Sequence, residues 1–590
     1  MTPSDLEVVR LNNLAEQARQ HGDKEKAATL FHRALEIIAR EAVGPSTEAA
    51  VWTNFGVLLL SLGKTGEAVE SQRRALELDL QRDAPAQDLG YSHHNLGVAL
   101  SESGSPEDGL QHLLKARDLR RAIHDYQELV LTLEQLGEVS LKLDRIDEAK
   151  AYAEEGLALS AVFGQNPILR GVLGVLATVA QRRGDFELAV QLQIEILDLL
   201  EQLRRRNSDL DRLDLFDSRY NTRYLSAIEL FLEAGRFREA IAVVDRTRFR
   251  SACDLLEGVR EFGSPIEADA LFLPELRENE LILVEWIYPK FDWSFPISTR
   301  HRDFKATKII TSDTPGPPVE LDLGTEWRTH FETTLRQTQR VIDAYEKELS
   351  NVSRVVFVPH GVQWQTPFAA LTHPTSRNRL QDTHEVLVAP SLRYCAITDS
   401  KERISSTRRL VIGDPTSDLS GARLEAQTVA QILGVEPLIG RNATREVVLS
   451  ALGGAEIDVL HYAGHGMYTA TGLSALELAD GPLTAEDVRK SGFKANVVNL
   501  ASCWGGMTAF TVWNELHGFV RALLSTGTGN VVCSVYPLGD AAASVFSRAF
   551  YEAHVAKARH PCSSFSIALK AIPSNTDPFM WGGLYITGRR

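Results

Sequence analysis

The hydrophobic and polar positions divide the chain into two regions with different periodicity. Residues 1–257 are rich in Ala, Leu, Glu and Arg, poor in proline and without clusters of Val and Ile, which is typical of helices. After Val259, apolar runs rich in β-branched residues alternate with helical stretches, beginning with ELILVEWIY (280–288). Several of these runs are continuously apolar, which indicates strands covered on both faces of a sheet. The pattern predicts an α-helical region followed by an α/β sandwich with a mostly parallel central sheet.

A short pattern recurs in the helical region: a glycine, an alanine about five residues later, then a bulky residue and another small one. The first five copies begin at spacings of 41, 41, 40 and 40 residues, and a sixth follows after a longer step. The copies begin at Gly22, Gly63, Gly104, Asp144, Gly184 and Gly235. Each is expected to form a helical hairpin, with the glycine or aspartate at the turn and small residues where the two helices approach closely. Gly56, Gly97 and Gly137 supply such small positions in the first helix of three copies.

This pattern resembles tetratricopeptide (TPR) repeats, with about six copies in residues 1–257 and a period of 40 to 42 in place of the usual 34. Each helix is therefore expected to be longer by most of a turn. Such an array implies a scaffold whose concave groove binds a protein, here an activating or inhibiting partner.

The remainder is expected to form a linking subdomain over residues 258–350 and the α/β domain proper over 351–590. The linking segment carries strands at 280–288 and 306–311 and a helix near 325–350. The later strands are predicted in RVVFVPHG (354–361), EVLVAPS (385–391), RRLVIGDP (408–415), IDVLHYAGHG (457–466), ANVVNLASCWGG (495–506) and NVVCSVYPLG (530–539), with a helix at 422–434. A ligand site in such a fold lies beyond the carboxyl ends of the strands.

Two strands end in residues suited to chemistry. His465 follows one strand and Cys503 another, so parallel neighbouring strands would bring the two to one edge of the sheet. Cysteine attacks as the thiolate, and an imidazole can take its proton and return it to a leaving amine. The amides of Gly466 and Cys503 are expected to form an oxyanion hole. His461 is expected to pack or hydrogen-bond within its strand.

The HYAGHG motif, followed by LASCWGG, resembles the His-Cys dyad of caspase-like cysteine peptidases, in particular the CHAT family, to which separase is related. RVVFVPHGVQWQTPFAAL, VIGDP and DPFMWGGLYITG resemble further segments of that family, and repeats are its usual companion. The resemblance implies a bacterial cysteine endopeptidase of clan CD that needs no metal or cofactor. It also implies antiviral defence or programmed cell death, for example through cleavage of a gasdermin-like partner, or work as the protease subunit of an RNA-guided effector complex.

Four residues are candidates for substrate binding. The resemblance to separase implies that Asp540 contacts the side chain before the cut bond, and a buried carboxylate there would select Arg or Lys. Asp540 alternatively caps the helix that follows it. Asp414 is a weaker candidate for the same pocket, against a turn role before Pro415. Trp504 and Tyr536 depart from the usual family residues, and both are expected near the substrate-binding wall.

Composition and charge limit the binding partners and the cellular compartment that the sequence allows. A balance of 63 basic against 78 acidic residues gives a net charge of −15, which disfavours direct binding of nucleic acid or anionic membranes. The five cysteines form no CxxC pair, so a reducing cytoplasm is expected, and Cys253, Cys395, Cys533 and Cys562 are expected to be structural. The first residues lack the apolar core of a secretory signal, and no apolar stretch reaches bilayer-spanning length. A non-catalytic protein-binding scaffold remains the alternative from another class.

Overall fold

The computed structural model divides the chain into two compact units, Met1–Ala234 and Gly235–Arg590. This grouping differs from the boundaries predicted at residues 257 and 350. The structure describes residues 2–20, 22–163, 169–205, 223–248, 252–253, 256, 274–288, 291–298, 307–309, 326–468, 474–503, 505–506, 509–510 and 516–590. No helix within these ranges combines the length and apolar character needed to cross a membrane.

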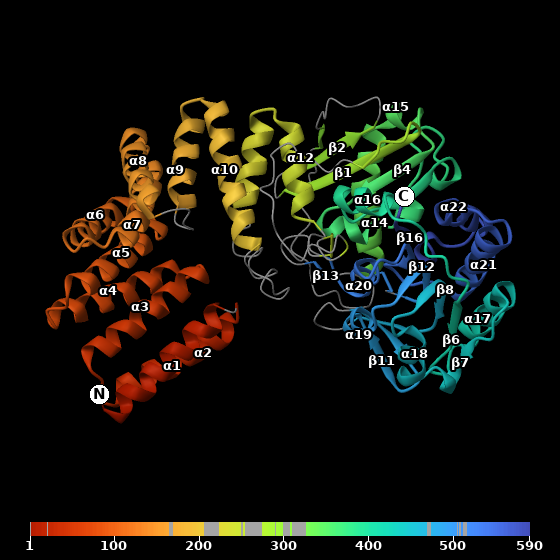
Figure 1. The fold of residues 1–590 in the computed structure, drawn as a ribbon, viewed down its shortest axis with the longest axis horizontal. Helices are drawn as coiled ribbons and strands as arrows, with labels where there is room; N and C mark the ends of the chain where they lie inside the picture. The colour runs from red at the N-terminus through yellow and green to blue at the C-terminus, as the bar shows by residue number, and fades with distance from the viewer. Residues whose placement is uncertain are drawn as a thin grey trace. The chain divides into compact units, whose positions relative to one another are not determined.

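The first unit consists of antiparallel helical hairpins (Figure 1). Its helices are α1 (Pro3–Gln20), α2 (Lys24–Arg40), α3 (Pro45–Ser61), α4 (Thr65–Gln81), α5 (Ala86–Glu102), α6 (Pro106–Ala122), α7 (Tyr126–Lys142), α8 (Ile146–Phe163), α9 (Leu169–Arg182) and α10 (Phe186–Arg205). All six predicted turn residues, including Gly235 at the start of the second unit, have positive φ, from 59° at Asp144 to 91° at Gly104. Glycine adopts this conformation without strain, which confirms the hairpin prediction.

The small residues of the repeats permit close approach of the paired helices. A Cβ added at Gly97 of α5 would lie 2.7 Å from Cγ of Leu113 and 2.9 Å from the carbonyl oxygen of Gly109, both in α6. The repeat alanines Ala27 and Ala68 are completely buried. The small residues of the repeat pattern thus lie where the two helices of a hairpin are in contact.

The second unit is built around an 11-stranded sheet in the order β3-β2-β1-β4-β5-β16-β15-β12-β8-β6-β7. The strands are β1 (Glu280–Tyr288), β2 (Phe291–Ile297), β3 (Thr307–Ile309), β4 (Arg354–Val358), β5 (Glu385–Val388), β6 (Arg409–Gly413), β7 (Leu438–Ile439), β8 (Glu456–Ala463), β12 (Lys494–Ala501), β15 (Asn530–Ser534) and β16 (Leu584–Gly588). Adjacent strands in β15-β12-β8-β6-β7 pair in parallel, as do β1, β4 and β5. The pairs β1-β2, β2-β3 and β15-β16 are antiparallel, and β16 makes one parallel bridge to β5. The predicted mostly parallel sheet is confirmed, and strands of the predicted linking segment extend it.

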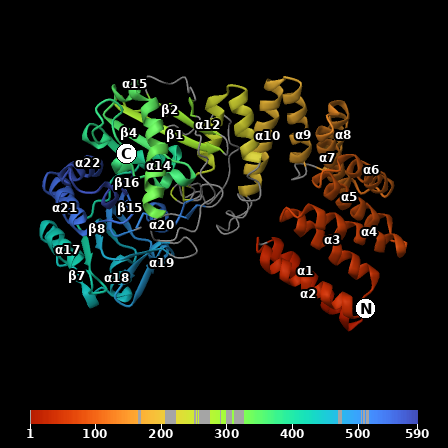
Figure 2. The same ribbon diagram turned by 180° about the vertical axis from the view of Figure 1, so that it is seen from behind.

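Helices pack around this sheet, and several of them contact one another (Figure 2). The helices are α12 (Phe237–Arg246), α14 (Glu326–Ala344), α15 (Glu346–Leu349), α16 (Leu392–Asp399), α17 (Ser420–Leu433), α18 (Arg445–Leu452), α19 (Ala485–Ser491), α20 (Phe519–Ser525), α21 (Asp540–Tyr551) and α22 (Pro561–Ala571). Among them, α21 contacts both α17 and α22, and α19 contacts α20.

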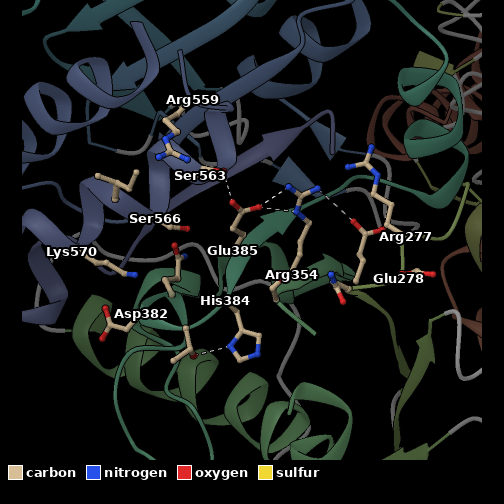
Figure 3. Close-up of a pocket in the computed structure, with 16 residues that line it drawn as sticks. Arg277, Glu278, Arg354, Asp382, His384, Glu385, Arg559, Ser563, Ser566 and Lys570 are labelled. Atoms are coloured by element: carbon tan, nitrogen blue, oxygen red, sulfur yellow. Dashed lines mark hydrogen bonds and ion pairs between the residues drawn. The ribbon is translucent and has the colours of Figure 1, made fainter. Parts of the chain in front are cut away.

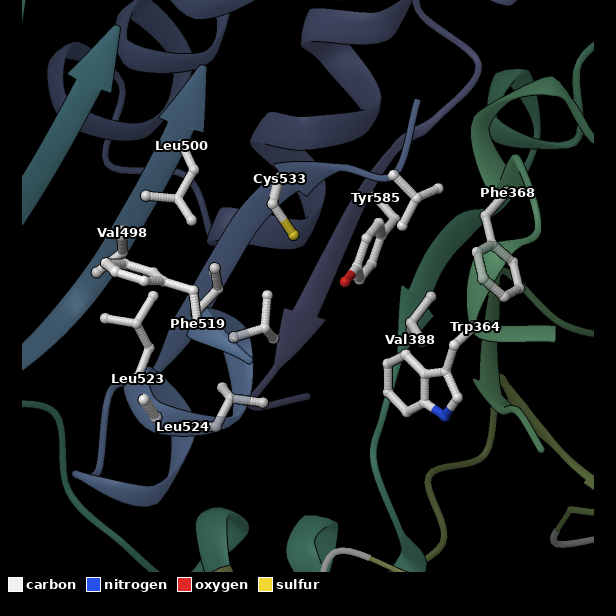
Figure 4. Packing of buried hydrophobic residues seen from close by; sticks show 14 of the residues in the cluster. Trp364, Phe368, Val388, Val498, Leu500, Phe519, Leu523, Leu524, Cys533 and Tyr585 are labelled. Carbon is white, nitrogen blue, oxygen red and sulfur yellow. The ribbon is translucent and has the colours of Figure 1, made fainter. Parts of the chain in front are cut away.

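Alternate residues of the central strands face opposite sides of the sheet, as the twofold strand period requires. Val498 and Leu500 of β12 join a hydrophobic core with Phe519 and Leu523 of α20 (Figure 4). Between them in sequence, Asn499 points to the other side, where its amide nitrogen lies 3.4 Å from Oγ of Ser547 in α21. Both faces are covered, which explains the continuous apolar runs in the sequence.

Candidate active site

The strands β8 and β12 place the two predicted reactive residues at equivalent positions. They are parallel neighbours, with Ala463 opposite Ala501, and His465 and Cys503 each follow two residues later. The adjoining loops touch, because a Cβ added at Gly466 would lie 2.0 Å from the carbonyl oxygen of Cys503. The expected parallel adjacency of the two strands is therefore present in the structure.

The imidazole and the thiol have separate partners. Nε2 of His465 lies 3.1 and 3.2 Å from the two carboxylate oxygens of Asp418. The N–H of Leu538 donates to Sγ of Cys503 over 3.4 Å. No hydrogen bond joins the imidazole to the thiol in the described part of the chain, although hydrogen bonds of this kind often tighten only when substrate is bound.

The surroundings of Cys503 favour the protonated thiol. Burial raises the pKa of the Cys503 thiol, and the negative charge of Asp540 raises this pKa further. The Leu538 N–H opposes both effects by stabilising the thiolate, but the net shift of the Cys503 pKa is upward. A base is therefore needed to generate the nucleophile at neutral pH.

The loop after β8 is held in a defined conformation. The Tyr462 hydroxyl lies 2.8 Å from the carbonyl oxygen of His465 and 2.7 Å from that of Glu477, and its single proton is shared between the two acceptors. The N–H of Glu477, in β10 (Ser474–Leu478), donates to the His465 carbonyl over 3.1 Å. This bond extends the antiparallel pairing of β10 with β9 (Gly466–Tyr468) by one residue, from Gly466 to His465.

Asp540 is the first residue of α21, and its side chain is exposed. Gly539, not Asp540, occupies the N-cap position, and a carboxylate in the first turn still stabilises the helix. The Asp540 carboxylate lies beside the start of α17, since a Cβ added at Gly421 would be 2.5 Å from its Oδ2. The Asp540 carboxylate is therefore an accessible negative charge near Cys503, whereas a buried carboxylate was expected from the sequence.

Asp414 has a structural role in the loop after β6. The residue is buried, with φ of 46°, and its carboxylate accepts from the N–H of Leu419 at 2.8 Å and from Nε of Arg423 at 2.9 Å. A second Arg423 nitrogen lies 2.7 Å from the same carboxylate. Because these internal donors engage both oxygens, the geometry favours the turn role over a substrate pocket.

Tyr536 packs in the core and does not form an exposed substrate-binding wall, contrary to the expectation from sequence. It is completely buried, its ring centroid lies 5.0 Å from that of Phe331, and its hydroxyl lies 3.1 Å from Oγ1 of Thr334. A large, mostly apolar ring gains more from this packing than from contact with water. Trp504, the other predicted wall residue, lies outside the described residues.

His461 forms a buried polar cluster, in line with its expected packing role. Its Nδ1 lies 3.3 Å from the hydroxyl of Tyr551, and its Nε2 lies 3.5 Å from Oε1 of Glu425 in α17. Burial lowers the pKa of His461 to about 3 and raises the pKa of Glu425 to about 8. At neutral pH both side chains are therefore uncharged, which removes most of the cost of burying them.

Protein-family models match part of each unit. A CHAT domain model matches residues 331–589, and a tetratricopeptide repeat model matches residues 7–81. The chain carries a caspase-like CHAT domain behind N-terminal TPR repeats.

Relatives and solved structures match the chain only in part. Tetratricopeptide repeat protein 28 of Homo sapiens is 24% identical over 298 residues, which cover 40% of this chain and 12% of the relative. The Mus musculus protein of the same name is 24% identical over 297 residues with the same coverage, so the chain spans about an eighth of these relatives. A putative kinesin light chain structure from Podosopora anserina, 17% identical with a TM-score of 0.31, covers 35% of this chain and 99% of its own. The apo form of RapI, 12% identical with a TM-score of 0.32, covers 39% and 92%.

Four of the five cysteines lie in the buried interior of the second unit. Cys253, Cys395, Cys533 and Cys562 are buried, whereas Cys503 is partly accessible. Burial raises the pKa of both Cys533 and Cys562 to about 12. Figure 4 shows Cys533 among the core side chains beside Tyr585. This burial distinguishes Cys503 as the accessible thiol of the set.

A cavity of about 550 Å³ lies on another side of the CHAT domain (Figure 3). It is lined by the first residues of β1, β4 and β5: Glu280, Arg354 and Glu385. Nη2 of Arg354 pairs with Glu385 at 2.6 Å, so these charges are satisfied within the protein. A neighbouring cavity contains both Arg354 and Asn530 of β15, which shows that the amino ends of the strands meet here. The dyad follows the carboxyl ends of β8 and β12, at the opposite edge of the sheet.

Sequence reasoning missed Asp418, the partner of His465. Asp418 lies in the loop after β6, and β6 is the neighbour of β8 on the side away from β12. The available signal was its position, four residues after Asp414 in a strand-end loop that was already singled out.

Proposed function

We propose that the CHAT domain is a cysteine endopeptidase in which Cys503 is the nucleophile and His465 the general base. The observation that carries this proposal is the register of β8 and β12, which sets the two residues at equivalent positions in touching loops. The partial accessibility of Cys503 among otherwise buried cysteines supports it.

In the proposed reaction, His465 takes the thiol proton, and the Cys503 sulfur attacks the carbonyl carbon of the scissile peptide bond. The developing oxyanion is held by the amides of Gly466 and Cys503; loss of one such donor costs about 3 kcal/mol in a studied serine protease. The C–N bond then breaks, the amine leaves with the proton from His465, and an acyl-enzyme thioester remains. Water, deprotonated by His465, hydrolyses the thioester and returns the free thiol.

Activity is proposed to depend on a binding event. The thiol is protonated and hydrogen-bonded to Leu538, and the imidazole is hydrogen-bonded to Asp418 and not to the thiol. Substrate binding, under the control of a protein partner held by the TPR repeats, would bring the two side chains together. This dependence fits a protease that must remain inactive until it is needed.

The exposed carboxylate of Asp540, near Cys503, supports cleavage after a basic residue. An Arg or Lys side chain would pair with it through a charge-assisted hydrogen bond. We place this cysteine peptidase in bacterial antiviral defence or programmed cell death, where cleavage activates a partner such as a gasdermin-like protein.

A peptide acyloxymethyl ketone ending in arginine tests the reactive residue and its specificity. It is expected to label the full-length protein at Cys503, detected by intact and peptide mass spectrometry, and to leave Cys503→Ala unlabelled. Asp540→Asn is expected to label more slowly with the arginine probe but equally with an alanine probe. Equal labelling of wild type and Cys503→Ala with both probes would refute the nucleophile assignment.

A non-catalytic scaffold is the second candidate, and the separation of thiol and imidazole favours it. The two candidates differ in one respect. A scaffold shows no Cys503 labelling even when its protein partner is bound, whereas the peptidase does.

A further inference from the structure

We propose that Asp418 is a positioning residue, which fixes the orientation and the proton-bearing nitrogen of His465. This inference rests on the proposed peptidase function and adds a third member to its dyad. The contact on which it depends joins the loop after β6 to the loop after β8.

The chemistry of the contact fixes the tautomer of the imidazole. An ionised carboxylate can only accept hydrogen bonds, so a neutral His465 whose Nε2 lies 3.1 Å from Asp418 must carry its proton on Nε2. The lone pair is then on Nδ1, which becomes the nitrogen able to take the Cys503 proton. The other tautomer would have its proton on Nδ1 and could not act as a base from that position.

Asp418 remains an acceptor because its surroundings keep it ionised. Thr416 donates its hydroxyl proton to the Asp418 carboxylate, and His465 donates a second hydrogen bond. These two contacts lower the pKa of Asp418. The carboxylate therefore stays charged at neutral pH, as an orienting group must.

The loop that presents Asp418 is anchored on both sides. The buried carboxylate of Asp414 accepts from the N–H of Leu419, the residue directly after Asp418, and the Ser417 N–H donates to the Asp414 carbonyl over 3.1 Å. The loop also packs against the residue before His465, since a Cβ added at Gly464 would lie 3.0 Å from Cδ of Pro415. Asp414 thus acts on the site indirectly, by holding the loop that holds Asp418.

A double-mutant cycle tests whether Asp418 acts through His465. The readout is the rate of Cys503 labelling by the arginine ketone, in the full-length chain co-expressed with its genomic neighbours. Asp418→Ala is expected to slow labelling about ten- to a hundredfold, less than the ~10⁴ seen for a buried orienting carboxylate, because the Asp418 side chain is 60% exposed. Asp418→Glu should restore part of the rate, and in a His465→Ala background Asp418→Ala should have no further effect.

Each other outcome has a definite meaning. Asp418→Ala labelling at the wild-type rate overturns the positioning role, and faster labelling means that the carboxylate restrains the imidazole. Equal slowing with and without His465 means that Asp418 acts only through the fold. If His465→Ala alone labels at the wild-type rate, the dyad itself fails, and the proposed function with it. Glu446→Gln, which removes one exposed charge from the same unit, serves as the control and should label normally.

Discussion

Gly466 offers a direct test of the packing between the two loops of the site. Its substitution by alanine would place a methyl carbon 2.0 Å from the carbonyl oxygen of Cys503, about 1.5 Å closer than an ordinary ~3.5 Å contact. The neighbour is backbone and cannot rotate away, so one of the two loops must move by about 1 Å or more. Overpacking of this kind costs about 1–3 kcal/mol of folding free energy.

The expected effect on chemistry is larger than the effect on stability. A misplacement of about 1 Å in a catalytic site reduces the rate on the order of 10²-fold. Gly466→Ala should therefore remain folded, with a modestly lower urea midpoint, while Cys503 labelling by the arginine ketone falls about a hundredfold. Gly453→Ala is the matched control, because a Cβ there would lie 3.4 Å from the nearest atom, the carbonyl oxygen of Leu449. Labelling of Gly466→Ala above half of the wild-type rate would refute the reasoning about loop contact.

Three further predictions concern stability, each measured by urea denaturation. Gly97→Ala should destabilise the repeat unit by about 1–3 kcal/mol, because the added methyl group would clash with α6. Gly66→Ala in α4, where an added Cβ has no atom within 4 Å, should be neutral or stabilising by up to about 1 kcal/mol. Similar effects of the two substitutions would contradict the close approach of the helices at Gly97. Cys533→Ser should destabilise the CHAT domain by about 1–3 kcal/mol, because it buries a hydroxyl group. A loss of stability no larger than that of Cys503→Ser would contradict this prediction. The folded-state pKa of Glu425, raised from 4.5 to about 8, gives stability that is complete below the unfolded pKa and lost as the pH rises through about 8. Glu425→Gln should therefore become more stable relative to wild type between about pH 5 and about pH 8, and a constant difference would contradict the raised pKa.

The sequence was sufficient for the features that depend on local periodicity. The turn residues of the repeats were predicted from a regular spacing, and β1, β8 and β12 from apolar runs. The bounds of β1 agree with the predicted run, and β8 and β12 each begin one residue before their predicted runs, which continue into the loops that follow. The placement of His465 and Cys503 after neighbouring parallel strands was predicted from the general rule that such strands end at one edge of the sheet. These inferences need only neighbouring residues and a fold class.

The features that were not predicted from the sequence depend on contacts between segments far apart in the chain. Asp418 contacts His465 across 47 residues, and its position in the strand-end loop after Asp414 does not by itself identify His465 as its partner. Tyr536 and Asp414 were assigned to the substrate site by position in a motif, but their packing partners, Phe331 and Arg423, were not visible in that motif. The strand β16 directly follows a glycine pair in the segment DPFMWGGLYITG and was not predicted as a strand.

The central claim is that Cys503 cleaves a protein, and protein termini report it most directly. The chain, as wild type or as Cys503→Ala, would be co-expressed with its genomic neighbours, and new protein termini would be sequenced in both. New termini that follow Arg or Lys in the wild type and are absent from Cys503→Ala are the predicted result. Identical termini in the two samples would contradict the peptidase assignment, and Cys503-dependent termini after neutral or acidic residues would retain the peptidase but reject the role of Asp540.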